Sequence, residues 1–85
     1  MATKTIVYKK EIAFHIRPIS LFTHEVKKSG CKVVVSKGDL TVQGEKTMQL
    51  LQLEICKNDE ITITVNGANE EILLDKLIQI MNGGE

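Results

Sequence analysis

The sequence predicts an α+β fold in which helices cover one face of a four-stranded, mostly antiparallel sheet. Residues 60–67, EITITVNG, alternate apolar and polar side chains, as a strand with one buried face does. Residues 18–29 instead place apolar side chains at helical spacing. The turn sequence KGD at 37–39 separates two short strand-like runs and predicts a hairpin. The predicted order of elements is β-α-β-β-α-β-α.

The first part of the chain is expected to form a strand followed by a helix. Residues 3–10 alternate in character and contain the β-branched side chains that favour a strand. The apolar stripe of the helix, at i, i+3, i+4 and i+7, consists of Ile19, Phe22, Thr23 and Val26. Because the residue before a proline resists the helical conformation, this helix should begin between Ile16 and Pro18. Gly30 predicts its end.

The remainder is expected to add the hairpin, a short helix, a strand and a final helix. The hairpin strands are predicted at 31–36 and 40–43, and residues 46–55 are rich in helix-forming Leu, Met and Gln. Asn69 is predicted to cap the final helix, whose first turn is acidic. The buried stripe of that helix is expected to contain Ile72 or Leu73, then Leu77, Ile80 and Met81.

Length and charge limit the classes of function. With 85 residues, the chain is expected to form one domain, residues 1–85. Its 11 basic and 11 acidic residues cancel, whereas a nucleic-acid binder needs a basic footprint. The same balance disfavours binding to an anionic membrane surface. No apolar run approaches the roughly 20 residues that span a bilayer.

The two cysteines give no metal signature. Cys31 and Cys56 form no CxxC pair and have no histidine at a spacing suited to zinc, so no metal or other cofactor is expected. A disulfide between them is left open by the sequence. The N-terminal MATKTIVYKK has no apolar signal-peptide core, which favours a reducing cytoplasm.

One short stretch, AFHIRPIS at 13–20, combines residues suited to phosphoryl chemistry. His15 lies just before the predicted helix start, where unpaired N–H groups and the positive end of the helix dipole attract anions. Arg17 adds a planar fork that fits phosphate oxygens, and nearby positive charge favours the nucleophilic neutral imidazole. A lone histidine at a helix start is equally compatible with a cap or a surface residue. The other histidine, His24, is expected on the solvent face of the helix.

The motifs in their order resemble a known family. FHIRPISLF, then the hairpin, KTMQLLQLEI, NDEITITVNGANEE and a terminal helix, are similar to the histidine phosphocarrier proteins, HPr, of the bacterial phosphoenolpyruvate:sugar phosphotransferase system. The resemblance covers almost the whole chain and implies an open-faced β-sandwich. It implies that His15 takes a phosphoryl group on its δ nitrogen from phosphorylated enzyme I and passes it to a sugar-specific enzyme IIA. Such a carrier is a substrate of other enzymes and is not itself an enzyme.

The resemblance also implies roles for the neighbours of His15. Arg17 would bind the phosphate, and Pro18 would shape the helix start so that the backbone N–H groups of Ile16 and Arg17 point at it. Partner proteins would dock on an apolar patch beside the histidine. Carried over, that patch comprises Ser20, Thr47, Met48, Leu51 and Gln52. For Met48 and Leu51, burial in the core is an equally good interpretation. The protein is expected to act as a monomer.

Residues around the motif depart from the family pattern. The family usually reads Gly-Leu/Ile-His-Ala-Arg-Pro-Ala, whereas this chain has Ala13, Ile16 and Ile19 in place of glycine and two alanines. Ala13 removes some backbone freedom. Ile16 and Ile19 are expected to crowd the docking surface or to change the choice of partner.

A second departure concerns regulation. Many members of the family carry a kinase-modified serine at the start of the second helix, and Lys46 occupies that position here. Lysine cannot accept this phosphate, so the regulatory site is expected to be absent. Thr47 would be the acceptor only if the register slipped by one residue. A fixed positive charge at this position should also attract acidic partners.

Two other functions compete with the phosphocarrier. In the first, the chain is a regulatory module in which phosphorylation of His15 switches binding to enzymes or transcription regulators. A small α+β nucleic-acid binder is the third class, which the zero net charge and the scarcity of aromatic residues oppose.

Overall fold

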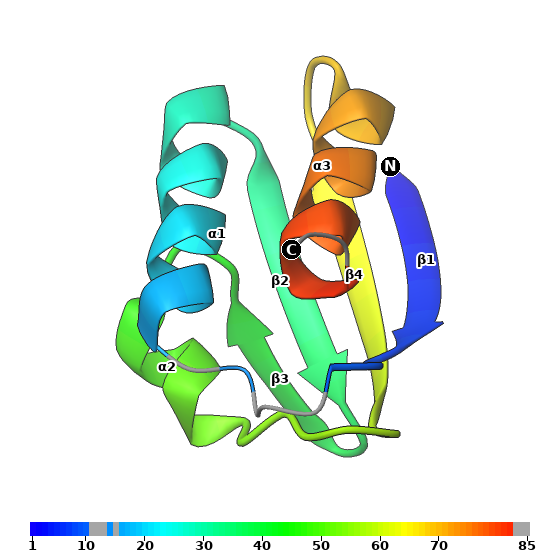
Figure 1. The fold of residues 1–85 in the computed structure, drawn as a ribbon. Coiled ribbons are helices and arrows are strands. Elements are labelled where there is room, and N and C mark those ends of the chain that lie inside the picture. Colours follow the sequence, from blue (N-terminus) through cyan, green and yellow to red (C-terminus); the bar gives the residue numbers. More distant parts are fainter. Residues whose placement is uncertain (11–13, 15, 83–85) are drawn as a thin grey trace.

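The computed structural model describes residues 1–10, 14 and 16–82 of the chain. Within them, Figure 1 shows the predicted order β-α-β-β-α-β-α. The elements are β1 (Ala2–Val7), α1 (Ile16–Ser29), β2 (Lys32–Lys37), β3 (Leu40–Gln43), α2 (Thr47–Gln52), β4 (Glu60–Asn66) and α3 (Glu70–Asn82). The α+β fold class predicted from the sequence is therefore confirmed.

The described strands form one sheet in the order β1-β4-β2-β3, and every pairing in it is antiparallel. The three described helices all lie on one face of this sheet, and none of them lies on the other face (Figure 1). Hydroxyl side chains line up across that open face. Thr62 of β4 is paired with Thr5 and with Ser36, and the hydroxyls of Thr5 and Thr62 hydrogen-bond at 2.9 Å. Such cross-strand pairs stabilise a sheet face exposed to water.

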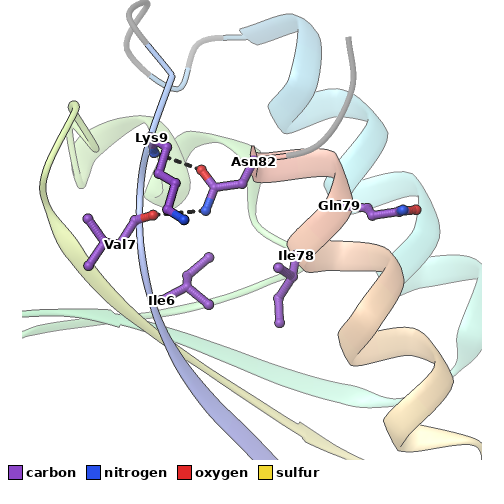
Figure 2. A pocket seen from close by; sticks show the side chains of 6 residues that line it. All are labelled: Ile6, Val7, Lys9, Ile78, Gln79 and Asn82. Carbon is purple, nitrogen blue, oxygen red and sulfur yellow. Dashed lines mark hydrogen bonds between the residues drawn. The ribbon is translucent and has the colours of Figure 1, made fainter.

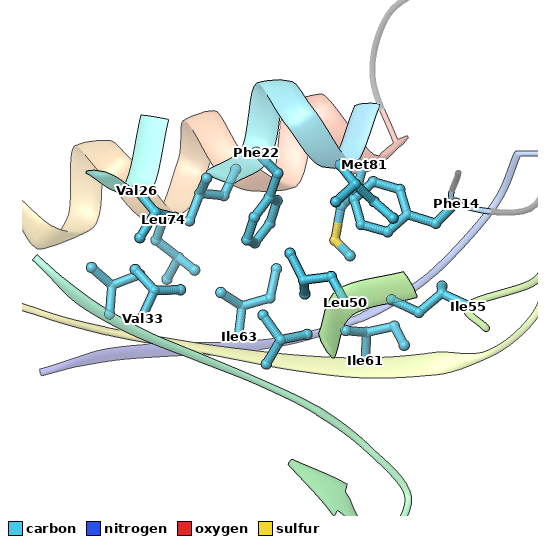
Figure 3. Close-up of a cluster of buried hydrophobic side chains, with 14 of the residues drawn as sticks. Phe14, Phe22, Val26, Val33, Leu50, Ile55, Ile61, Ile63, Leu74 and Met81 are labelled. Carbon is cyan, nitrogen blue, oxygen red and sulfur yellow. The ribbon is translucent and has the colours of Figure 1, made fainter. Parts of the chain in front are cut away.

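The hydrophobic core fills the space between the sheet and the helices (Figure 3). In β4 the inward residues Ile61, Ile63 and Val65 are fully buried, as the alternation predicted. The predicted stripe of α1 is also buried; it consists of Ile19, Phe22, Thr23 and Val26. This helix ends at Ser29, and Gly30 follows with a φ of 74°, the left-handed conformation that glycine adopts easily at a helix end.

Two elements end earlier than predicted, and side chains from elsewhere explain both. β1 stops at Val7 because the N–H of Lys9 donates to Oδ1 of Asn82 in α3. α2 stops at Gln52. The ammonium of Lys37 binds the carbonyls of Leu53 and Glu54, each at 2.8 Å, and Glu54 has a φ of 51°, which a helix cannot contain. Each prediction was therefore too long by three residues at its C-terminal end.

The stripe of α3 differs in detail from the prediction. Its buried residues are Leu73, Leu74, Leu77 and Met81. Ile72, the alternative to Leu73, is 70 % exposed, and Ile80 is only half-buried. Asn69 accepts the N–H of Leu73 with its backbone carbonyl, but its φ of 56° is not the extended conformation of an ordinary N-cap. The carboxylate of Glu70 instead reaches back to the N–H of Gly67, at 3.1 Å.

Both cysteines are free thiols, Cys31 buried and Cys56 exposed, which settles the question of a disulfide that the sequence left open. Across the part of the chain that the structure describes, no helix combines the length and the apolar character needed to cross a bilayer.

Candidate functional site

The proposed phosphoryl acceptor is defined in the structure by its neighbours. His15 and Ala13 lie outside the described residues, and so does the side chain of Ile16. Phe14 is described, and α1 begins at Ile16, as the position of Pro18 predicted. His15 is therefore flanked on one side by a buried aromatic residue and on the other by the first residue of a 14-residue helix.

The beginning of α1 has the charge distribution that an anion requires. Arg17 is exposed, Pro18 is half-buried in the same turn, and the described first turn contains no acidic residue. The first N–H groups of a helix have no acceptor within it, and the helix dipole makes this end positive. Pro18 offers no N–H of its own, which costs nothing at a position where the helix would leave it unpaired. A phosphoryl group at this end would meet only favourable charge from the turn.

The predicted docking residues lie at the junction of α1 and α2. The hydroxyl of Thr47, the first residue of α2, donates to Oγ1 of Thr23 in α1 at 3.4 Å. Ser20 and Gln52 are exposed, and Met48 is 69 % exposed. We call Ser20, Thr47, Met48, Leu51 and Gln52 the α1–α2 face.

For the two residues whose interpretation was open, burial gives different answers. Met48 is on the surface, while Leu51 is half-buried and packs against the core. Leu50, which lies between them in the sequence, is the buried residue of α2. An exposed methionine on a short helix is available for contact with a partner, because the helix already uses Leu50 to attach itself to the core.

The expectation that Ile19 crowds the docking surface was wrong. Ile19 is 0 % exposed and belongs to the core, so it cannot crowd a docking surface. The helical period explains this placement, because Ile19 begins the buried stripe of α1. For Ala13 and the side chain of Ile16, the expected effects concern parts of the chain outside the described residues.

Lys46 stands at the N-cap of α2. Its backbone is extended, with φ −103° and ψ 99°, and its side chain makes no capping hydrogen bond. A lysine side chain has no acceptor atom, so it cannot satisfy the N–H groups that serine would. Thr47, the alternative phosphate acceptor, is the first helical residue and its hydroxyl is directed to Thr23.

Two further residues hold parts of the chain between β1 and α1, and sequence reasoning missed both. The backbone N–H of Phe14 donates to the carbonyl of Ile55 at 2.9 Å, and the phenyl ring is buried. The amide of Asn82 joins the end of α3 to the chain leaving β1, since it accepts from the N–H of Lys9 at 2.8 Å and donates to the carbonyl of Val7 at 2.9 Å (Figure 2). Phe14 stood in the quoted motif, but nothing local to Asn82 predicted its partners.

Asn82 also lines a small groove between β1 and α3, whose lining side chains are drawn in Figure 2. The residues that line it are Ile6, Val7, Lys9, Ile78, Gln79 and Asn82.

His24 is exposed on α1, as expected. Among the residues that the structure describes, no group of histidine, cysteine and carboxylate side chains could hold a metal ion.

Comparison with known proteins decides the family. The sequence model of the family described as "PTS HPr component phosphorylation site" matches residues 2–83. The chain belongs to the HPr family. This family supplies phosphocarrier proteins to the phosphotransferase system, the PTS, so the general role suggested by the HIRP motif is supported by the whole chain and not by four residues.

Individual HPr proteins are similar at low identity over their full length. The HPr of Borreliella burgdorferi is 25 % identical over 81 residues, which cover 95 % of this chain and 94 % of that one. The crystal structure of an HPr from Bacillus anthracis is 25 % identical, with a TM-score of 0.87 and coverage of 95 % and 96 %. That of Thermoanaerobacter tengcongensis HPr, 23 % identical, has a TM-score of 0.86 and coverage of 95 % and 91 %. The open-faced β-sandwich of HPr is therefore the fold of this chain.

Proposed function

We propose that this HPr-family protein accepts a phosphoryl group on the δ nitrogen of His15 from phosphorylated enzyme I and donates it to an enzyme IIA. The observation that carries the proposal is the family match over residues 2–83, in a chain whose helix α1 begins at Ile16, the residue that follows His15 in the sequence. In this proposal the protein is a cytoplasmic monomer that serves as a substrate of both enzymes and needs no cofactor.

The charges around the helix start suit a group that must be held and then released. The δ nitrogen of a neutral imidazole attacks phosphorus, and the bond from phosphorus to the donor breaks as the new P–N bond forms. Arg17 and the N–H groups of Ile16 and Arg17 then face the dianion. They stabilise it by hydrogen bonds and partial charge without the full neutralisation that a metal ion would give, so the group remains transferable.

The α1–α2 face is proposed as the surface on which both enzymes dock. Its exposed Met48 supplies apolar contact, and Ser20 and Gln52 supply a polar margin. Lys46 lies next to this face and is fixed in charge, so we also propose that the kinase control found at this position in many members of the family is absent here. An acidic surface on the partner would complement the positive charge of Lys46 best.

The experiment that tests the carrier is a measurement of intact mass. The protein is mixed with enzyme I, phosphoenolpyruvate and magnesium. We expect a gain of one phosphoryl group that is labile in acid, absent in His15→Ala and retained in the matched variant His24→Ala. No gain with an enzyme I that phosphorylates another HPr, or a gain that survives in His15→Ala, would reject the proposal.

A regulatory module is the second candidate, and Lys46 at the N-cap of α2 is the observation that favours it. In that case His15 would be phosphorylated, but the group would control binding to partner enzymes or transcription regulators. Onward transfer separates the two functions. A carrier loses its phosphoryl group within seconds when enzyme IIA is added, whereas a regulatory module keeps it against every enzyme IIA of the same cell.

A further inference from the structure

We propose that the outer edge of β1, with the groove between β1 and α3, binds an extended segment of a partner protein that carries one acidic side chain. The segment would add to the four-stranded sheet as a further strand. This surface lies at the edge of the sheet away from α1 and α2 (Figure 1). The inference goes beyond the proposed function and does not rest on it.

The backbone of β1 presents hydrogen-bonding groups at this edge. Among the described strands, β1 pairs only with β4. Just after β1, the N–H of Tyr8 donates to the carbonyl of Asp59, the residue before β4, at 2.9 Å, so Tyr8 turns these groups toward β4. In an antiparallel pair, residues bonded to the neighbouring strand alternate with residues whose N–H and C=O groups point the other way. Thr3, Thr5 and Val7 therefore direct these groups to the outer edge.

The side chain of Asn82 shows that this edge accepts a further amide. Its Oδ1 accepts the N–H of Lys9 at 2.8 Å, and its Nδ2 donates to the carbonyl of Val7 at 2.9 Å (Figure 2). Both of these backbone groups point outward by the same alternation, and a side-chain amide offers a donor and an acceptor as a peptide group does. Asn82 thus takes the place of one residue of an added strand and sets where that strand must end. The outward groups of Thr3 and Thr5 lie earlier in β1.

The opposite edge of the sheet is covered by contacts from α2 and the turn before it. β3 has four residues, and the N–H of its last residue, Gln43, donates to Oε1 of Gln49 in α2 at 3.2 Å. The carbonyl of Gln43 accepts the N–H of Lys46 at 3.1 Å. Short length and such coverage keep other chains from adding to an outer strand. β1, with six residues, is therefore the edge of this sheet that is suited to addition.

Side chains beside β1 define what the added strand must carry. Ile6 of β1 and Ile78 of α3 are half-buried and both line the groove (Figure 2). A residue opposite Ile6 would place an apolar side chain against them, on the face of the sheet that α3 covers. Two positions along the added strand, on the same face, lies the residue opposite Lys4, which is exposed. Directly opposite residues are about 5 Å apart from Cβ to Cβ, so an acidic side chain there forms an ion pair with Lys4.

The charges around the groove favour one acidic residue and not a run of them. Glu71 and Asp75 are exposed and share the side of α3 that carries Ile78, because they precede it by seven and three residues. They belong to the helix layer, whereas the residue opposite Lys4 is the direct neighbour of that lysine, so Lys4 decides the charge at its own position. A second copy of β1 does not fit, since Ala2–Val7 contains no acidic residue to pair with Lys4.

The probe is a synthetic hexapeptide, acetyl-SVTETS-amide, written for antiparallel addition because every described strand pair is antiparallel. In this register its valine lies opposite Ile6 and its glutamate opposite Lys4. The peptide is added to the isotope-labelled full chain, and amide shifts and hydrogen exchange are followed by NMR. Near saturation, we expect exchange to slow at Thr3 and Thr5. Exchange at Lys4 and Ile6, whose N–H groups already point to β4, should change little.

Charge reversal tests the role of Lys4. Acetyl-SVTKTS-amide should bind the wild type more weakly than the glutamate peptide by about fivefold or more, and Lys4→Glu should invert this preference. Lys32→Glu is the matched control, because Lys32 is an exposed lysine of an inner strand, and it should keep the wild-type preference. Both substitutions are at exposed positions, so both variants should fold.

Three results would overturn the inference. The first is the absence of saturable shifts with either peptide, and the second is a set of shifts centred on residues 40–43 of β3. The third is a preference between the two peptides that Lys4→Glu leaves as it is in the wild type. Because none of these measurements uses enzyme I or His15, they stand apart from the test of the phosphocarrier.

Discussion

The ammonium nitrogen of Lys37, in β2, lies 3.1 Å from Oδ2 of Asp59, which precedes β4, and each side chain is less than a third exposed. The N–H of Cys56 first, and then Lys37, hold the pKa of Asp59 below its ordinary value of 3.8. A carboxylate with a lowered pKa contributes stability that is complete above its ordinary pKa and is lost as the pH falls through the lowered one.

The stability of the protein should therefore fall with acid below pH 3.8 in part because of Asp59. In Asp59→Asn this part of the pH dependence disappears, so urea unfolding midpoints measured from neutral pH down to acid should give a flatter curve. Parallel curves for wild type and Asp59→Asn would contradict the role of this contact.

Lys46 makes α2 less stable than it could be. Lys46→Ser should raise the free energy of unfolding by about 0.5–1 kcal/mol, because a serine oxygen accepts N–H groups of the first turn and a positive charge leaves the positive helix end. Urea unfolding measures the change. Lys46→Ala removes the charge without adding an acceptor and should give a smaller gain. A serine variant that is no more stable than the alanine variant would argue against capping.

Met48 and Leu50 should separate docking from folding within one helix. Met48→Ser removes an exposed side chain, so we expect the KM for enzyme I to rise while the free energy of unfolding hardly changes. Leu50→Ala empties a buried site and should cost about 2–5 kcal/mol of stability. Steady-state kinetics and urea unfolding on both variants test this. A Met48→Ser variant with an unchanged KM would place the docking surface elsewhere.

Asn82, the last residue of α3, joins this helix to the end of β1 through two hydrogen bonds of its side-chain amide, one to Val7 and one to Lys9. Asn82→Ala should lower the free energy of unfolding by about 1–2 kcal/mol, because both bonds are lost together. Amide hydrogen exchange should show the loss at Lys9, whose N–H loses its acceptor. Gln79→Ala, at another residue that lines the groove, is the control. In this variant the amide of Lys9 should exchange as slowly as in the wild type.

Local periodicity was sufficient to predict most of the fold. The alternation in 60–67 and the helical spacing in 18–29 identified the central strand and the stripe of α1, because each pattern spans enough residues to define one buried face. Ile19 shows the value of that signal. The helical pattern placed it in the core, while the comparison with an alanine in related proteins suggested the surface, and the pattern was right.

Contacts between distant residues could not be predicted in the same way. The end of α2 depends on Lys37, and the end of β1 depends on Asn82, 73 residues after Lys9 in the chain. Neither side chain differs in any local feature from others of its kind. For the candidate site, the helix start at Ile16 was predicted from Pro18 alone, whereas the support of Phe14 required the loop at Ile55. The role of His15 remains a prediction from its motif.

Lys4 has a consequence for how these molecules behave when crowded together. The pairing of Lys4 with Ile63 puts it on the same face of the sheet as the core, yet β1 is an outer strand and Lys4 is exposed. An outer strand offers a free row of backbone groups to which another chain could add. Extending the sheet would bring a neighbour against this ammonium group and strip it of water, so this one lysine discourages fibrous self-association.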